Sequence, residues 1–132
     1  MTESNYFSKD NFAKHVGIEL IESSKGYAKA KMEIQDCHIN GVQVVQGGAI
    51  YSLAIWTFAI AANTHGMAVG LSASIQYTNS VSRGTLYAEA KENVLGQTVG
   101  SYSVTVTDDR DNIVAVVQAM SYRKRNKSKK KA

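Results

Sequence analysis

Hydrophobic and polar residues alternate along much of this chain, and the alternation predicts β-strands. Between residues 27 and 34, Ala28, Ala30, Met32 and Ile34 fall on one face, and polar or charged residues fall on the other. A strand of this kind has one buried face and one face in solvent. The same period predicts strands at 16–23, 69–78, 85–94 and 99–107. A further strand, 113–122, is apolar on both faces for much of its length, as expected inside a sheet.

One segment departs from this alternation. Residues 49–63 read AIYSLAIWTFAIAAN and carry no charge. The run is too long for one strand, and its Ala and Leu residues favour a helix. Because it is apolar nearly all round, the helix must be enclosed by other elements. We expect it to cover about residues 48–63 with Gly66 as its C-cap, and we expect a short additional helix at 8–15.

The order of these elements predicts the architecture. It consists of two strands, one buried helix and then a four-strand meander. An α+β fold in which an antiparallel β-sheet wraps around one long central helix satisfies this order. A chain of 132 residues suits a single core, so we expect one domain over residues 1–122.

Charge is concentrated at the C-terminal end. Residues 123–132 hold 7 of the 15 Lys and Arg residues, which leaves 8 basic against 11 acidic residues in the rest of the chain. Like charges repel, so we expect this basic tail to be a solvated, disordered end. It has no aromatic residue after Tyr122, which argues against single-stranded nucleic acid. We expect no nucleic acid or membrane contact through it.

The composition also limits the compartment and the chemistry. Cys37 is the single cysteine, so no disulfide forms within the chain and a reducing, cytoplasmic location is expected. The N-terminal residues lack a signal-peptide pattern. No cluster has metal-ligand spacing, and no phosphate-loop or dinucleotide fingerprint is present. We therefore expect neither a metal nor a bound cofactor.

Gln46-Gly47-Gly48 comes directly before the predicted helix. Two glycines allow the backbone to approach another group closely. The first N–H groups of a helix lack acceptors and favour negative charge, so this entry could bind an anion or a polarised carbonyl. The same glycines could instead serve close packing of helix on sheet. The helix itself offers no Asp, Glu, Lys, Arg or His for chemistry.

These motifs resemble the hot-dog-fold thioesterase family, in particular its phenylacetyl-CoA thioesterase (PaaI-like) group. The family pattern is an H-x-N loop, then His-Gly-Gly, then a helix reading Leu-Ala-Asp or Leu-Ala-Glu. The matching triplets here are His38-Ile39-Asn40, Gln46-Gly47-Gly48 and Leu53-Ala54-Ile55. The stretch GLSASIQYTNSVSRGTLYAEA also matches, and the resemblance spans roughly residues 16–122.

The resemblance implies an acyl-CoA thioesterase whose active site lies between the subunits of a homodimer or of a homotetramer. Coenzyme A would enter only as part of the substrate. A backbone N–H near Gly47 or Gly48 would polarise the thioester carbonyl, and Asn40 would orient the thioester or a water. The further positions implied to bind substrate are His38, Gln46, Ile55, Ser72, Ser74 and Arg83.

Two substitutions separate this chain from the family pattern. Gln46 replaces the His and cannot act as a base near neutral pH. Ile55 replaces the helix carboxylate that attacks the carbonyl or activates water, and no Asp or Glu lies between Asp36 and Glu89. Two hypotheses follow. One is a thioesterase with an atypical site, and the other is a protein that binds an acyl-CoA without hydrolysing it.

Several candidates also have a purely structural interpretation. Asn40 could only fix a turn, and His38 could be a structural residue although an unperturbed imidazole suits a base at neutral pH. Ser72 and Ser74 could simply lie on an exposed face. Cys37 beside His38 is not expected to form a nucleophilic pair, because adjacent residues on an extended segment point apart.

Overall fold

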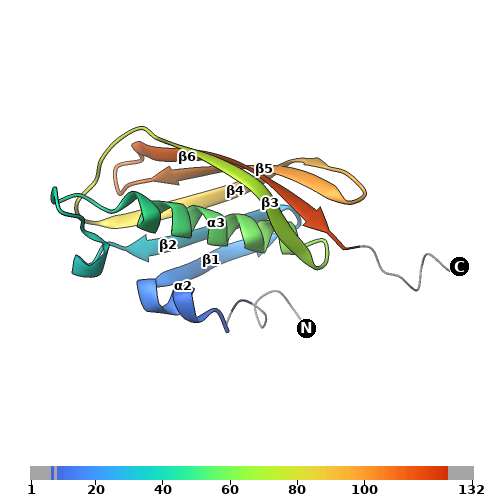
Figure 1. Cartoon of the computed structure of the whole chain (residues 1–132), viewed down its shortest axis with the longest axis horizontal. Helices are drawn as coiled ribbons and strands as arrows, with labels where there is room; N and C mark the ends of the chain where they lie inside the picture. Colours follow the sequence, from blue (N-terminus) through green and yellow to red (C-terminus); the bar gives the residue numbers. More distant parts are fainter. Residues whose placement is uncertain (1–6, 8, 125–132) are drawn as a thin grey trace, which may run out of the picture.

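The computed structural model describes residue 7 and residues 9–124 (Figure 1). Its elements in chain order are α2 (Asn11–Val16), β1 (Ile18–Ser24), β2 (Tyr27–Glu33), the short 3₁₀ helix η1 (Asp36–His38), α3 (Gly47–Asn63), β3 (Ala68–Tyr77), β4 (Thr85–Leu95), β5 (Val99–Thr107) and β6 (Ile113–Arg123). None of the described helices has the length and hydropathy needed to cross a membrane.

The strands form one six-stranded sheet in the order β1-β2-β4-β5-β6-β3. Every neighbouring pair is antiparallel. Figure 1 shows the sheet curving around α3, which runs along its inner face. The predicted α+β architecture, an antiparallel sheet around one long helix, is confirmed. β6 lies inside the sheet, as its two apolar faces predicted.

The predicted four-strand meander is wrong in one respect. β4, β5 and β6 form a meander, but β3 pairs with β6 at the far edge, and β4 pairs with β2. The β2–β4 ladder places Ala28 opposite Ala90 and Ala30 opposite Ala88, and all four are fully buried. Because these side chains are small, the helix can pack close to the sheet at this point. The alternation of apolar and polar residues does not predict which strands pair to form this surface.

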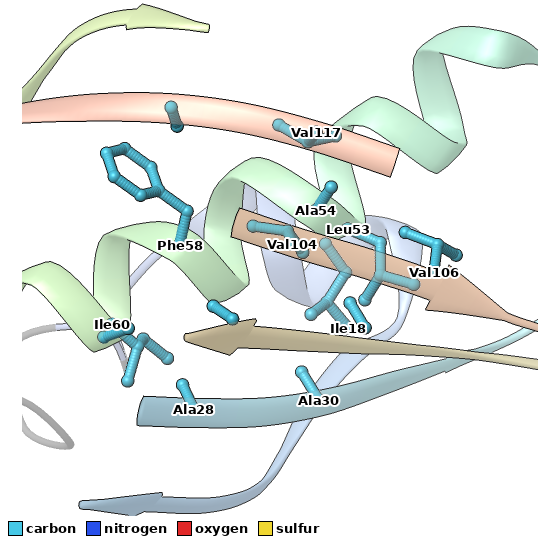
Figure 2. Packing of buried hydrophobic residues seen from close by; sticks show 14 of the residues in the cluster. Ile18, Ala28, Ala30, Leu53, Ala54, Phe58, Ile60, Val104, Val106 and Val117 are labelled. Carbon is cyan, nitrogen blue, oxygen red and sulfur yellow. The ribbon is translucent and has the colours of Figure 1, made fainter. Parts of the chain in front are cut away.

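The core lies between α3 and the sheet. Figure 2 shows Leu53, Phe58 and Ile60 of the helix gathered with alanines of β2 and valines of β5 and β6. The Phe58 ring meets the ring of Tyr102 edge-on, with centroids 5.4 Å apart. Burial on most sides of α3 confirms that its uniformly apolar sequence belongs to an enclosed helix.

Both ends of α3 differ slightly from the prediction. The helix begins at Gly47, and its C-cap is Thr64 instead of Gly66, which has a φ of 119° in the following turn. The Thr64 hydroxyl accepts the N–H of Gly26 at 2.8 Å. The side-chain amide of Asn63 donates to carbonyls in the helix and in β3. Side-chain bonds thus make a glycine cap unnecessary.

The two ends of the described chain also shift the predicted boundaries. α2 begins at Asn11, later than the predicted residue 8, because the Asp10 carboxylate caps it by accepting the Ala13 N–H at 2.9 Å. β6 continues through Arg123, whose guanidinium donates to the carbonyls of Gly96 and Gln97. Most of the predicted basic tail, residues 125–132, lies outside the described residues.

The enclosure of α3 makes a stability prediction. Leu53 is fully buried, so Leu53→Ala should lower the free energy of unfolding by about 2–5 kcal/mol. Leu95, which is 42% exposed at the end of β4, provides the control, and Leu95→Ala should change stability by about 1 kcal/mol or less. Urea denaturation of both variants measures the difference. Equal losses would contradict an enclosed helix.

Candidate functional site

The first turn of α3 leaves two backbone N–H groups without acceptors. The N–H groups of Ala49 and Ile50 both donate to the carbonyl of Gln46, at 2.9 and 3.3 Å. Those of Gly47 and Gly48 have no hydrogen-bond partner in the described part of the chain. Helix geometry directs such groups outward, where the helix dipole adds positive potential. The start of α3 can therefore bind an anion or a polarised carbonyl oxygen.

Gln46 caps the helix only through its backbone. Its side chain is exposed and makes no capping bond, while its N–H donates to the carbonyl of His38 at 2.7 Å. The Gln46 amide is thus accessible beside the unpaired N–H groups. The Gln46 amide can donate and accept hydrogen bonds but cannot act as an acid or a base near neutral pH.

Tyr77, near the end of β3, reaches the same turn of the helix. Its hydroxyl donates to the Gly47 carbonyl at 2.9 Å. A Cβ at Gly47 would lie 3.1 Å from the ring and hydroxyl of Tyr77, whereas one at Gly48 would meet nothing closer than 3.9 Å. The packing interpretation therefore applies to Gly47, while Gly48 has open space in front of it. Partial burial, and then the nearby Tyr51 phenol, raise the pKa of Tyr77, so its hydroxyl remains a donor.

Asn40 organises the loop that leads to the helix. Its side-chain oxygen accepts the N–H groups of Val42 and Val44, at 2.9 and 3.2 Å. Its backbone N–H donates to the Val44 carbonyl at 2.8 Å. The turn-forming role is therefore present. The Nδ2 group of Asn40 has no acceptor among the described residues and can still donate to another molecule.

His38 is buried and fully engaged within the fold. Its Nδ1 accepts the N–H of Gln35 at 3.0 Å, so Nε2 carries the proton and donates to the carbonyl of Val16 at 2.7 Å. Neither ring nitrogen is available to a substrate or to the exposed thiol of Cys37. The structure thus gives His38 a structural role: it fastens η1 to the end of α2.

Ile55 lies on α3 two turns beyond the glycines. The four-residue spacing of Gly47, Tyr51 and Ile55 places them along one side of the helix. Ile55 is half-buried and packs against the core. A hydrocarbon side chain therefore lies on this side of the helix, two turns beyond Gly47.

Ser72 and Ser74 do not converge on the helix start within one subunit. Both are exposed on β3, and Ser74 lies opposite Gln118 of β6. Ser74 lines a shallow hollow of about 370 Å³ on the outer face of the sheet, together with Gln76, Ser103, Thr105 and Gln118. Ser72 and Ser74 therefore lie on an exposed part of β3 in the single subunit, since α3 covers the other face of the sheet.

Arg83 lies in the loop between β3 and β4, next to the approach to α3. In this loop, the Val81 carbonyl accepts the N–H of Val45, at 2.8 Å, just before the helix. Arg83 and Arg110 line a hollow of about 480 Å³ that also includes Asp108 and Asp109. The hollow thus combines two arginines with two aspartates. In the described part of the chain, no three His, Cys, Asp or Glu side chains come together as a metal site.

The sequence does not identify Tyr77 as a neighbour of the helix start. Tyr77 is 50% exposed at the end of β3, and its hydroxyl donates to the Gly47 carbonyl. The available signal was Gly47 itself, because a glycine at a helix entry indicates that another group comes close. The glycine does not indicate which group this is, and here the group is a side chain 30 residues further along the chain.

Comparison with known proteins adds independent findings. Residues 43–115 match the family model described as Thioesterase superfamily. Acyl-coenzyme A thioesterase PaaI of Escherichia coli is 32% identical over 119 residues, which is 89% of this chain and 85% of that protein. A protein of Archaeoglobus fulgidus that is named as an esterase is 34% identical over 119 residues, which is 89% of this chain and 77% of that protein. The solved structure of the E. coli PaaI protein from the phenylacetic acid degradation operon has a TM-score of 0.89 and 30% identity, covering 92% of this chain and 90% of that chain.

The different surroundings of the two glycines predict different responses to alanine. Gly48→Ala should keep or raise stability, because alanine favours a helix by up to about 1 kcal/mol over glycine and the space is open. Gly47→Ala should be about 1 kcal/mol less stable than Gly48→Ala, because its methyl group would push the Tyr77 ring and hydroxyl aside and weaken their hydrogen bond to the Gly47 carbonyl. Chemical denaturation of the pair measures this difference. Equal stabilities would show that Tyr77 does not pack on Gly47.

Proposed function

Because this chain belongs to the thioesterase superfamily, we propose that it binds an acyl-CoA at the start of α3 and hydrolyses its thioester bond. The observation that carries the proposal is the pair of unpaired N–H groups of Gly47 and Gly48. They lie inside the segment that matches the family, in a chain 32% identical to an acyl-CoA thioesterase.

The helix start supplies the polarising half of the reaction. Water adds to the thioester carbonyl, the C–S bond breaks, and a carboxylic acid and the CoA thiol leave. Negative charge develops on the carbonyl oxygen, and preorganised N–H donors stabilise such a charge by a few kcal/mol each. The free Nδ2 of Asn40 is a candidate to orient the thioester or the water. CoA is part of the substrate, and these steps need no other cofactor.

The helix provides no carboxylate or imidazole to activate water, and this observation favours a second candidate function. Ile55 can neither attack a carbonyl nor accept a proton, and α3 holds no other ionisable acid or base besides Tyr51. A protein with these residues could hold an acyl-CoA and release it unchanged. Binding without hydrolysis is therefore the alternative to a thioesterase with an atypical site.

Arg83 and Arg110 are the proposed partners of the CoA phosphates. They line the hollow of about 480 Å³ beside the approach to α3. A guanidinium can donate two parallel hydrogen bonds to a phosphate. The carboxylates of Asp108 and Asp109 line the same hollow and would repel a phosphate, so the two guanidinium groups must outweigh them for CoA to bind here.

The proposed active unit is a homodimer formed through β3, with a tetramer of two dimers as a further possibility. β3 is an edge of the sheet, and Val69, Leu71 and Tyr77 on it are at least half exposed. Unpaired strand edges need pairing or protection. Pairing of β3 with a second copy would extend the sheet and bring two helix starts to one interface. The exposed thiol of Cys37 supports a cytoplasmic location.

The missing carboxylate predicts a gain of activity. If Ile55 faces the thioester, Ile55→Asp should raise hydrolysis of an acyl-CoA, because a positioned base contributes about 10²–10⁴-fold. The apolar setting raises the pKa of the new carboxyl, and a modest rise still leaves a base near pH 7. A thiol reagent measures CoA release from a panel of acyl-CoAs across pH, and calorimetry measures binding in parallel.

The control is Ile55→Asn. Asn has nearly the same shape as Asp but cannot act as a base, so this variant should show no gain in hydrolysis. An Ile55→Asp protein that is folded and binds acyl-CoA without any gain would show that Ile55 does not face the thioester. Fast hydrolysis by the wild type would establish the enzyme with a different base. A wild type that binds without hydrolysing would establish the alternative function, and one that does neither would overturn both.

The proposed dimer predicts a change in assembly. Leu71→Lys should convert the dimer to a monomer, because it places a charge on an apolar edge strand that would become buried. Val94→Lys is the matched control, since Val94 is 62% exposed on β4 away from the β3 edge. Sedimentation at micromolar concentration compares the two variants. A monomeric wild type would remove the inter-subunit site altogether.

A further inference from the structure

Tyr77 makes an unusual contact for a side chain on an edge strand. It is 50% exposed, so its hydroxyl could bond to water. Instead the hydroxyl donates to the first carbonyl of α3, that of Gly47, at 2.9 Å. The ring also packs so closely on Gly47 that a Cβ there would lie 3.1 Å from it. No step of the proposed reaction uses this contact.

The contact fixes one particular peptide group. The Gly47 carbonyl and the Gly48 N–H are opposite ends of the same planar, trans peptide unit. A donor held on the oxygen therefore restrains the direction of the N–H. It also polarises the unit, and such cooperative strengthening is on the order of 10–30% per bond. The Gly48 N–H is one of the two groups without an acceptor in the described chain, and space is open in front of Gly48.

Backbone bonds anchor the residue before this turn, since the Gln46 N–H donates to the His38 carbonyl and the Gln46 carbonyl accepts from the helix. The bond from Tyr77 is the side-chain contact that acts on the Gly47 carbonyl itself. Gln46 provides no side-chain cap, and two consecutive glycines have more backbone freedom than any other pair of residues. An oxyanion donor is effective only when it is held in position before the charge develops. Tyr77 supplies this restraint from a strand, which is a rigid element.

We propose that Tyr77 is a positioning residue that aims and polarises the Gly48 N–H toward the thioester carbonyl. This inference rests on the proposed function, because it assigns the donor of that same site. Tyr77 need not touch the substrate. Its hydrogen bond acts through the peptide group between Gly47 and Gly48.

The test replaces the hydroxyl and keeps the ring. Tyr77→Phe should lower kcat for acyl-CoA hydrolysis about tenfold, which is what one net hydrogen bond supplies. KM should stay within about twofold, because the charge on the carbonyl oxygen develops in the transition state. The matched control is Tyr87→Phe on β4, where the ring meets the Lys29 ammonium at 5.9 Å from its centroid and needs no hydroxyl. Its kcat should equal that of the wild type.

A second readout needs no substrate. Labelling with ¹⁵N-glycine leaves ten backbone amide signals, and Gly48→Ala identifies that of Gly48 by its disappearance. Tyr77→Phe should shift the Gly48 signal, because the amide nitrogen senses hydrogen bonding at the carbonyl of its own peptide group. Tyr87→Phe should leave it in place. An unchanged Gly48 signal in a folded Tyr77→Phe protein overturns the inference.

A second variant keeps the test valid if Tyr77→Phe weakens folding or assembly. Replacing Tyr77 by 3,5-difluorotyrosine keeps the hydroxyl and lowers the pKa of the phenol. The kcat of this variant should fall as pH rises through that lowered pKa, while the wild-type kcat shows no such step. If the ring of Tyr77 had only a structural role, the two proteins would have the same dependence of kcat on pH. Matching profiles, or an unchanged kcat in Tyr77→Phe, overturn the inference alone. Absence of acyl-CoA binding and hydrolysis in the wild type overturns the proposed function, and the Gly48 signal then still decides whether Tyr77 restrains the peptide.

Discussion

The enclosure of α3 by the curved sheet is the constraint on which the rest of the structure depends. A helix that is apolar on nearly every side has no stable position on a surface. It can lie close to the sheet because Ala28, Ala30, Ala88 and Ala90 face it from two paired strands. Larger side chains at these positions would hold the helix away from the sheet and expose its apolar sides. The position of the helix start, and so of any site there, follows from this packing.

Both ends of the helix are then fixed by polar bonds to distant parts of the chain. At the C-terminal end, Thr64 bonds to Gly26 of the first hairpin. At the N-terminal end, the Gln46 N–H bonds to His38, and the Gly47 carbonyl bonds to Tyr77. His38 in turn joins Gln35 and Val16. The unpaired N–H groups are thus presented by a turn that is held from two directions, although it contains the two most flexible residues.

The sequence predicted what depends on local pattern and missed what depends on pairing over distance. The extent of α3 and of β5 followed from composition and period, because burial acts on each segment directly. The place of β3 beside β6 did not follow, because alternation describes faces and not neighbours. The same limit applies to the site. Gly47 and Gly48 were visible as a motif, but Tyr77 became part of the site only once the fold was known.

In the proposed site, Ile55 stands where the family pattern has a carboxylate, and two opposing demands would act on that carboxylate. A carboxylate on an enclosed helix must be kept partly desolvated, which opposes its charged form and weakens packing. A hydrocarbon in that place removes this penalty and packs against the core, as Ile55 does. Sites for chemistry are commonly retained at the expense of stability, so under the proposed function a hydrocarbon at this position favours stability over the activation of water. The donors at Gly47 and Gly48 are backbone groups that need no such penalty, since their N–H groups lack acceptors in any helix start. Under the proposed function, binding of a carbonyl at the helix start therefore does not depend on the residue that activates water.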